Sequence, residues 1–288
     1  MKYIVILGDG MADEPLEELG GKTPLEYART PNMDRIAREG MMGMIRTIPE
    51  GYEAGSDIAN LGILGYDPRS CYTGRGPLEA ASMGIALAAD DIAYRCNLVT
   101  ISDGVMADFS AGHISSEEGR SLFATLAEQI PSVPLYPGVS YRNLLVLRGG
   151  GGAVTYPPHD IIGEKIDPYL PAGKDAGILL KCMEKSREVF LDHPVNLART
   201  ANAQPPATQI WPWSGGKRPS LIPFRHLFGK DGGVISAVDL LQGIARLAKM
   251  EVIQVPGATG YLDTDYQAKA AYALDAAKHL DFVYVHIE

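Results

Sequence analysis

Strand-like and helix-like segments alternate through the C-terminal part of the chain, and this alternation leaves few possible folds. Apolar runs typical of strands occur at 232–238, 251–256 and 281–288, and segments with a helical apolar period separate them at 238–250 and 263–280. Strands that alternate with helices are joined by right-handed crossovers into a parallel sheet with helices on both faces. We therefore predict an α/β fold with a parallel-sheet core.

The first residues give a signal of the same type. The run KYIVILGDG, residues 2–10, is apolar as far as Gly8, which is typical of a buried parallel strand whose end opens into a loop. In parallel sheets, ligands bind at the edge where the strands end. Asp9 follows this strand directly, so we expect it at that edge.

Three further elements are predicted before residue 65. A helix is expected at 31–39, because Thr30 can cap its start and Gly40 follows its end. The run MMGMIRTI at 41–48 predicts a second strand, and SDIANLGIL at 56–64 predicts a further helix.

The middle of the chain has a different pattern. Strand-like runs flank Ser102-Asp103-Gly104, which is a hairpin signal, and long helical stretches occur at 115–129 and 173–191. This mixture is typical of an α+β module, and Pro205-Pro206 indicates a hinge at its end. We predict that residues 77–204 form a module inserted into a discontinuous core domain, 1–76 and 205–288.

Composition excludes several functional classes. With 288 residues, of which 46% are hydrophobic, the chain can bury a core, and its net charge of −9 gives no basic footprint for nucleic acid or an anionic membrane. Its three cysteines lack CxxC spacing, so we expect reduced, buried thiols. The N-terminal apolar run is too short for a signal peptide or a membrane span. These features indicate a cytoplasmic protein whose anionic ligands would need a local cluster of Arg and Lys.

Two patterns that suggest ligand sites are incomplete. The sequence GGKT at 20–23 resembles the end of a P-loop, but Leu16 occupies the position of the first glycine, so an exposed turn is the better interpretation. The six histidines lack HxxxH and HExxH spacing, so the pattern predicts no metal site formed by histidines.

Asp9 and Ser56 are the main candidates for chemistry, and each has a structural alternative. Asp9 is either a ligand for a divalent cation at the strand end or a loop residue that bonds its own turn. Ser56 is either a helix cap or a nucleophile whose phosphorylated form the positive helix end would stabilise. No Ser-His-Asp arrangement is visible to activate the hydroxyl, so a metal held by Asp9 would have to do so.

Several segments in the same order resemble one known family. The segments ILGDGMAD, GGKTPLEYARTPNMDRIAREG, GSDIANLGILGYDP and YTGRGPLEAASMGI resemble those of archaeal-type 2,3-bisphosphoglycerate-independent phosphoglycerate mutases, which belong to the alkaline phosphatase superfamily. The resemblance continues through AYRCNLVTISDGV and the C-terminal segments, so it covers essentially the whole chain. It implies an alkaline-phosphatase-like core, an inserted α+β lid that binds substrate, and a glycolytic enzyme.

The resemblance also implies roles for the two candidate residues. Family members use the serine that matches Ser56 as the nucleophile, and a phosphoserine forms while phosphate moves between 3-phosphoglycerate and 2-phosphoglycerate. The aspartate that matches Asp9 is a ligand in a site for two divalent metal ions, usually manganese or zinc, which also bind the serine oxygen. The expected partner is phosphoglycerate and no nucleotide is expected, while homo-oligomerisation stays open.

Five residues are candidates for binding the substrate anion. Arg75, Arg142 and Lys230 stand beside loops where backbone can approach a phosphate or a carboxylate. Arg75 has further support, because independent mutases carry a Gly-Arg shortly after the nucleophile segment. Arg95 and Asn97 lie on a predicted strand of the insert. For each residue the alternative is a salt bridge at the surface.

Two departures keep other functions open. The family's remaining metal ligands come from C-terminal loops that begin just after the strand matching FVYVHIE, so the sequence as given is expected to be a C-terminally truncated form that could be inactive. The opening LGDGMAD resembles the bacterial branch of the family, which includes proposed homoserine kinases. Phosphoryl transfer to homoserine is therefore the alternative reaction.

Overall fold

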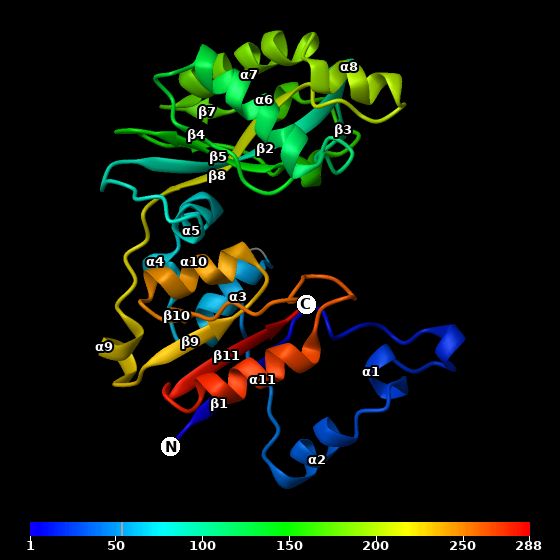
Figure 1. Cartoon of the computed structure of the whole chain (residues 1–288), viewed down its shortest axis with the longest axis vertical. Coiled ribbons are helices and arrows are strands. Elements are labelled where there is room, and N and C mark those ends of the chain that lie inside the picture. The colour runs from blue at the N-terminus through cyan, green and yellow to red at the C-terminus, as the bar shows by residue number, and fades with distance from the viewer. Residues whose placement is uncertain (53) are drawn as a thin grey trace. The chain divides into compact units, whose positions relative to one another are not determined.

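The computed structural model describes residues 1–52 and 54–288 and divides the chain into two compact units (Figure 1). Unit 1 consists of Met1–Pro68 and Ile222–Glu288, and unit 2 is the continuous segment Arg69–Leu221. None of the described helices combines the length and the apolar character that a membrane crossing requires.

Unit 1 contains a four-stranded sheet in which every pair of neighbours is parallel, as predicted. The strand order is β1-β11-β9-β10, and the register pairs Tyr3 with Phe282 and Gly8 with Ile287. The strands are β1 (Tyr3–Gly8), β9 (Gly232–Ile235), β10 (Glu251–Val252) and β11 (Phe282–Ile287). The helices of this unit are α1 (Pro24–Tyr27), α2 (Pro31–Glu39), α3 (Ser56–Ile63), α9 (Phe224–Phe228), α10 (Asp239–Leu247) and α11 (Tyr266–Ala276).

Helical spacing of apolar residues explains how the C-terminal helices pack. In α10, Leu240, Leu241 and Ile244 are buried, and these positions share one face. In α11, Ala273 and Ala276 pack against Val283 and neighbouring apolar residues of the sheet. The predicted strand-helix alternation of this part of the chain is therefore confirmed.

Two predictions for the N-terminal part of the chain are wrong. Residues 3–8 do form a strand, but β1 lies at the edge of the sheet, and Tyr3, Ile4 and Ile6 are 46%, 43% and 65% exposed. Residues 41–48 form no strand. An apolar run becomes a buried strand only where neighbouring elements cover it, and no described element does so here.

Unit 2 is built on an antiparallel sheet around the long strand β2 (Ile92–Ser102). The sheet order is β3-β2-β5-β4, with β8 also paired to β2. The predicted hairpin is confirmed, because Asp103 and Gly104 join β2 to β3 with φ values of 49° and 74°, as tight hairpin turns require. The other strands are β3 (Val105–Asp108), β4 (Leu135–Tyr136), β5 (Arg142–Leu147), β6 (Ala153–Val154), β7 (Ala172–Gly173) and β8 (Gln209–Lys217).

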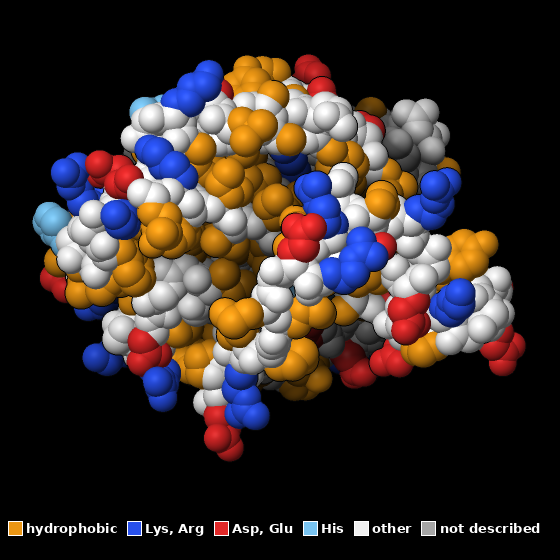
Figure 2. Space-filling model, turned by 90° about the horizontal axis from the view of Figure 1, so that it is seen from below, with side chains coloured by type: hydrophobic (Ala, Val, Ile, Leu, Met, Phe, Trp, Pro, Cys, Tyr) orange, Lys and Arg blue, Asp and Glu red, His pale blue; other side chains and the backbone are white. Residues whose placement is uncertain are grey.

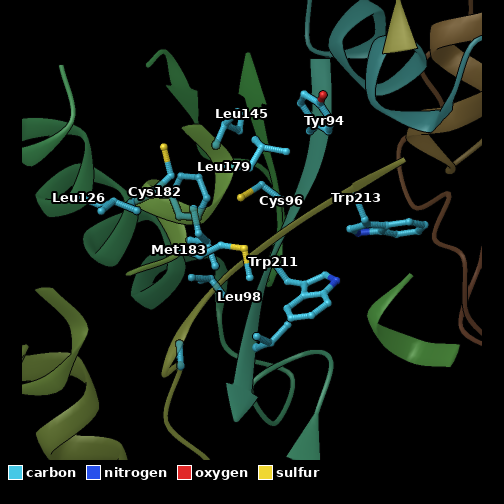
Figure 3. Close-up of a cluster of buried hydrophobic side chains, with 14 of the residues drawn as sticks. Tyr94, Cys96, Leu98, Leu126, Leu145, Leu179, Cys182, Met183, Trp211 and Trp213 are labelled. Atoms are coloured by element: carbon cyan, nitrogen blue, oxygen red, sulfur yellow. The ribbon is translucent and has the colours of Figure 1, made fainter. Parts of the chain in front are cut away.

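Helices cover both faces of the unit 2 sheet. They are α5 (Arg75–Ser82), α6 (Ser116–Gln129), α7 (Ala176–Leu191) and α8 (Pro194–Ala201), and the short α4 (Pro68–Cys71) precedes them. The main core lies between β2, α6, α7 and β8; Figure 3 shows Tyr94, Cys96, Leu98, Leu126, Met183 and Trp211 in it. The three cysteines are free and buried, as expected. On the other face, Ala80 of α5 packs against Ala93 and Leu144.

The boundaries of the units differ from the predicted ones. The chain leaves unit 1 after Pro68 and returns at Ile222, whereas we predicted changes at 76/77 and 204/205. The return comes later because residues 209–217, which follow the predicted hinge at Pro205-Pro206, form β8 of unit 2. Gly216 is needed there, since a Cβ atom would collide with the carbonyl oxygen of Thr73.

Truncation of Leu98 tests the assignment of the unit 2 core. Leu98 is 0% exposed, so Leu98→Ala leaves a cavity and should lower the free energy of unfolding of unit 2 by about 2–5 kcal/mol. The control is Leu191, which is 73% exposed on α7. Leu191→Ala should change the free energy of unfolding by less than about 0.5 kcal/mol. Denaturant titration monitored by tryptophan fluorescence measures both. Equal losses would contradict the core assignment.

Candidate active site

Asp9 lies where β1 ends, at the ligand-binding edge of the parallel sheet. Its backbone N–H donates to the carbonyl oxygen of Ile287 at 2.8 Å, which fixes the start of the loop. Its carboxylate Oδ2 lies 3.1 Å from Nε2 of His286 on β11. The His286 side chain is 2% exposed and that of Asp9 is 31% exposed. A buried imidazole thus orients a carboxylate that still reaches solvent.

Ser236 adds a third polar group at this edge. Its Oγ lies 3.4 Å from Nδ1 of His286 and accepts a hydrogen bond from the N–H of Val238 at 3.0 Å. Ser236 follows β9, so three neighbouring strands each bring one polar side chain to the edge. The sequence analysis found Asp9 but missed His286 and Ser236, because only the register of the parallel strands aligns them.

Ser56 is the first residue of α3, and the cap position is occupied by Gly55. No side-chain capping hydrogen bond forms at this helix start, and Ser56 is exposed. The alternative in which Ser56 serves only as a helix cap therefore does not describe the structure. The hydroxyl lies at the positive end of the helix dipole, where backbone N–H groups favour an anion.

A buried hydrogen-bonded pair ties the first turn of α3 to β11. The Nδ2 of Asn60 donates to the carbonyl oxygen of Ser56 at 2.8 Å, and the hydroxyl of Tyr284 donates to Oδ1 of Asn60 at 2.5 Å. Asn60 is 1% exposed and Tyr284 is 0% exposed. Tyr284 and His286 are two residues apart on β11, so their side chains leave the same face of the sheet. One face of one strand thus positions both Ser56 and Asp9.

The Tyr284 hydroxyl stays protonated and therefore remains a hydrogen-bond donor. Burial raises the pKa of the Tyr284 hydroxyl far above its ordinary value, and the negative charge of Asp9 raises it further. The influence of Asp9 also indicates that the carboxylate and the phenol lie near one another. The proton that bonds Asn60 therefore stays in place across the range of pH in which enzymes work.

Lys230 lies at the opposite edge of the sheet from Asp9. It precedes β9, and it lines an apolar pocket together with Tyr3 and Phe282, which begin β1 and β11. Asp9 follows the other end of β1, so the length of the strand separates the two side chains. Our expectation that Lys230 shares a substrate site with Asp9 and Ser56 is therefore not supported, because strand direction carries it to the other edge.

In unit 2, the other predicted anion-binding residues come together around Trp213. The guanidinium of Arg95 lies 4.6 Å from the centre of the Trp213 ring, and that of Arg75 lies 5.7 Å from it. The indole Nε1 of Trp213 donates to Oδ1 of Asn97 at 2.9 Å. Arg142 pairs with Asn97 in the β2–β5 register. Antiparallel pairing brings Arg95, Asn97 and Arg142 together, and the start of α5 adds Arg75. We call these four residues the arginine cluster.

The arginine cluster includes one ion pair with a carboxylate. The Nε of Arg95 lies 3.0 Å from Oε1 of Glu79, an ion pair whose geometry gives that nitrogen no hydrogen bond. Burial lowers the pKa of the Arg95 guanidinium and Glu79 raises it, while the nearby cations Arg142 and Arg75 lower it further. The guanidinium groups of Arg75, Arg95 and Arg142 thus lie near one another. In a chain with a net charge of −9, this is a local site suited to an anion.

His159, on the short 3₁₀ helix Pro158–Ile161, borders the arginine cluster. Its ring meets Trp213 edge to face, with 5.2 Å between the ring centres. Burial lowers the pKa of His159, Asp160 raises it, and Arg75 and Arg95 lower it. The sequence analysis missed His159, Trp213 and Glu79, since no spacing rule connects them before the strands are paired.

The described residues do not by themselves form a two-metal site. Within residues 1–52 and 54–288, no three His, Cys, Asp or Glu side chains gather closely enough to hold a metal ion. Asp9 and His286 offer an oxygen and a nitrogen at one place, which falls short of the four to six ligands that zinc or manganese takes.

Comparison with known proteins identifies the family to which this chain belongs. A model of the 2,3-bisphosphoglycerate-independent phosphoglycerate mutase family matches residues 37–196. The chain is 54% identical to the mutase of that name from Methanothrix thermoacetophila over its whole length, and it covers 74% of that relative. It is 52% identical to a probable mutase of this kind from Geobacter sulfurreducens, of which it also covers 74%.

Two solved structures agree with this result. The PH0037 protein of Pyrococcus horikoshii is 32% identical and superposes with a TM-score of 0.81, over 99% of this chain and 70% of that protein. The cofactor-independent phosphoglycerate mutase of Thermoplasma acidophilum is 28% identical with a TM-score of 0.62, over 100% of this chain and 77% of that enzyme. This chain belongs to the 2,3-bisphosphoglycerate-independent phosphoglycerate mutase family.

Proposed function

We propose that this chain supplies the phosphoryl-accepting serine and the anion-binding residues of a mutase that interconverts 3-phosphoglycerate and 2-phosphoglycerate. The observation that carries the proposal is the position of Ser56. Its hydroxyl is exposed at a helix start, makes no capping bond, and is tied through Asn60 to the strand that orients Asp9. The phosphoglycerate substrate and a cytoplasmic location are parts of this proposal.

The reaction would proceed by two transfers of one phosphoryl group. Ser56 Oγ gives up its proton and attacks the phosphorus of 3-phosphoglycerate, the bond to the 3-oxygen breaks, and that oxygen takes up a proton. The 2-hydroxyl of the glycerate then gives up its proton and attacks the phosphoserine. The bond between Ser56 Oγ and phosphorus breaks, and Oγ takes up a proton, which restores the serine hydroxyl. The start of α3 stabilises the anionic phosphoserine, because its backbone N–H groups and dipole favour negative charge.

Unit 2 would bind the anionic substrate. The arginine cluster offers planar guanidinium groups that match carboxylate and phosphate oxygens, and the Trp213 ring holds two of them in orientation. We propose Arg75, Arg95, Arg142 and Asn97 as substrate-binding residues, in the role expected for a lid. Lys230 has no part in this proposal.

A metal contribution is proposed only for Asp9 and Ser56. In a complete family member, metal ions would lower the pKa of the nucleophile and neutralise the phosphoryl oxygens. The residues described here are too few to hold them, so a second candidate function is a chain that binds phosphoglycerate without turnover on its own. Because relatives extend beyond the match, the activity test uses this chain joined to the remaining segment of the Methanothrix thermoacetophila relative.

The Ser56→Ala variant of this joined protein tests the proposed function. It should lose at least about a thousandfold in the rate of 2-phosphoglycerate formation, since the acceptor of the phosphoryl group is gone. The assay follows conversion of 3-phosphoglycerate with manganese and without ATP. A joined protein that is inactive here but phosphorylates homoserine with ATP would overturn the mutase proposal. Activity only in the joined form would support the second function for the chain alone.

Arg142→Met tests the arginine cluster. Arg142 is exposed, so its loss should leave the fold intact while binding of 3-phosphoglycerate to the chain weakens by about tenfold, which corresponds to about 1.4 kcal/mol. Arg225→Met is the control, because Arg225 in unit 1 is an exposed arginine paired with Asp231. Isothermal titration calorimetry measures both variants. Equal effects would mean that general charge, and not the cluster, binds the anion.

Tyr284→Phe tests whether the buried pair positions Ser56. Loss of the hydroxyl leaves Oδ1 of Asn60 without its donor, so stability should fall by about 1–3 kcal/mol and kcat of the joined protein by about tenfold, with KM unchanged. Tyr94→Phe is matched, since Tyr94 is also 0% exposed and donates to Asp175 in unit 2. It should cost similar stability and leave kcat unchanged. If kcat is unchanged in both variants, Tyr284 contributes only to stability and does not position Ser56.

A further inference from the structure

The strand β8 departs from regular geometry beside the arginine cluster. In its pairing with β2, Ala93 lies opposite Gly216 and Arg95 lies opposite Trp213, so two residues of β8 occupy a space that one residue of β2 spans. Such an extra residue is a β-bulge, a feature that often lies next to functional sites and changes the direction of a side chain. Ser214 lies within this bulge, and its φ of 47° is left-handed backbone that residues other than glycine rarely adopt.

The side chain of Ser214 contacts the start of α5. Its Oγ accepts a hydrogen bond from the backbone N–H of Arg75 at 3.0 Å. Arg75 is the first residue of α5, and the first N–H groups of a helix have no acceptor within the helix. The cap position before it is Gly74, which has no side chain to supply an acceptor. A residue of another strand, Ser214, therefore fixes the backbone at this helix start.

The residue next to Ser214 holds the other end of Arg75. The guanidinium of Arg75 lies 5.7 Å from the centre of the Trp213 ring. Consecutive side chains of a regular strand point to opposite faces of the sheet, so two neighbours on β8 would not ordinarily contact the same residue. The bulge removes this restriction. Trp213 and Ser214 together hold the guanidinium and the backbone of one arginine.

Further contacts keep the bulge in place. The N–H of Ser214 donates to Oγ1 of Thr155 at 3.1 Å. A Cβ atom on Gly74 would lie only 2.9 Å from the carbonyl oxygen of Ser214, so the close approach of these two segments requires glycine. Left-handed backbone at a serine costs conformational energy, which such contacts must offset. Strain that the surroundings impose in this way is typical of functional sites.

We propose that Ser214 is a positioning residue for substrate binding, because it holds the start of α5 so that Arg75 and Arg95 meet the same anion. Cations alone do not make such a site, since Figure 2 shows Lys and Arg side chains at several separate places on the face seen from below. Guanidinium groups that are oriented before binding lose less conformational freedom when the anion arrives. This role rests on the proposed function, in which Arg75 binds phosphoglycerate.

Calorimetric titration of this chain with 3-phosphoglycerate tests the role of Ser214. Ser214→Ala removes the acceptor for the Arg75 N–H, so Kd should rise about three- to tenfold, the range expected for the loss of one hydrogen bond. Ser214→Gly also lacks the hydroxyl but adopts a φ of 47° without strain, so it should stay folded and weaken binding to the same extent. An unchanged Kd in both variants would overturn the inference.

Ser186→Ala is the matched control. The hydroxyl of Ser186 on α7 also accepts a hydrogen bond from β8, donated by the N–H of Ile210 at 3.0 Å. Its loss leaves a buried N–H without an acceptor, so the melting temperature should fall at least as far as in Ser214→Ala, while Kd should stay within about twofold. An equal rise in Kd would mean that the stability of β8 sets the affinity, and this would overturn the positioning role.

A double-mutant cycle with Arg75→Met separates this role from the proposed function. If Ser214 acts through Arg75, Ser214→Ala should weaken binding no further in the Arg75→Met background. Equal losses in both backgrounds would overturn the positioning role and leave substrate binding by Arg75 intact. An unchanged Kd in Arg75→Met alone would overturn both.

Kinetics of the joined protein give a second measure that a purely structural role would not predict. Ser214→Ala should raise KM about three- to tenfold and leave kcat unchanged, because the oriented arginine binds substrate and transition state alike. Ser186→Ala should change neither. A KM that rises equally in both variants would contradict the specific role of Ser214.

Discussion

The candidate active site depends on two side chains from one face of β11. Tyr284 holds the first turn of α3 through Asn60, and His286 holds the carboxylate of Asp9. Asn60, Tyr284 and His286 are all buried, and in such surroundings a half-satisfied polar network costs more free energy than an apolar core. The position of Ser56 is therefore set by a buried network attached to the middle of a sheet, and not by a loop.

In unit 2, several cationic side chains gather at one place although the chain as a whole is acidic. Burial and mutual repulsion disfavour three guanidinium groups at one place, as the lowered pKa of Arg95 indicates. Glu79 compensates part of this charge, and the Trp213 ring stabilises two of the groups through its π face. Guanidinium groups held near one another in this way are well suited to bind one anion together.

Much of the fold could be predicted, and the failures share a cause. The C-terminal alternation and the Asp103–Gly104 turn depend on local signals, so the sequence was sufficient for them. The strand β8 was missed because Pro212 and Gly216 are loop signals, yet each is compatible with a strand that pairs on one side. His286 and Trp213 became functional candidates only through register, which brings together residues far apart in the sequence. The burial of β1 was predicted wrongly because burial depends on a neighbour.

The central claim is that Ser56 carries the phosphoryl group, and trapping that group tests it directly. The joined protein is incubated with 3-phosphoglycerate, quenched in acid, digested and analysed by mass spectrometry. The account predicts one added phosphoryl group on the peptide that contains Ser56, specifically on that residue, and none in Ser56→Ala. Turnover with no modified peptide, or with the phosphoryl group on another residue, would contradict it.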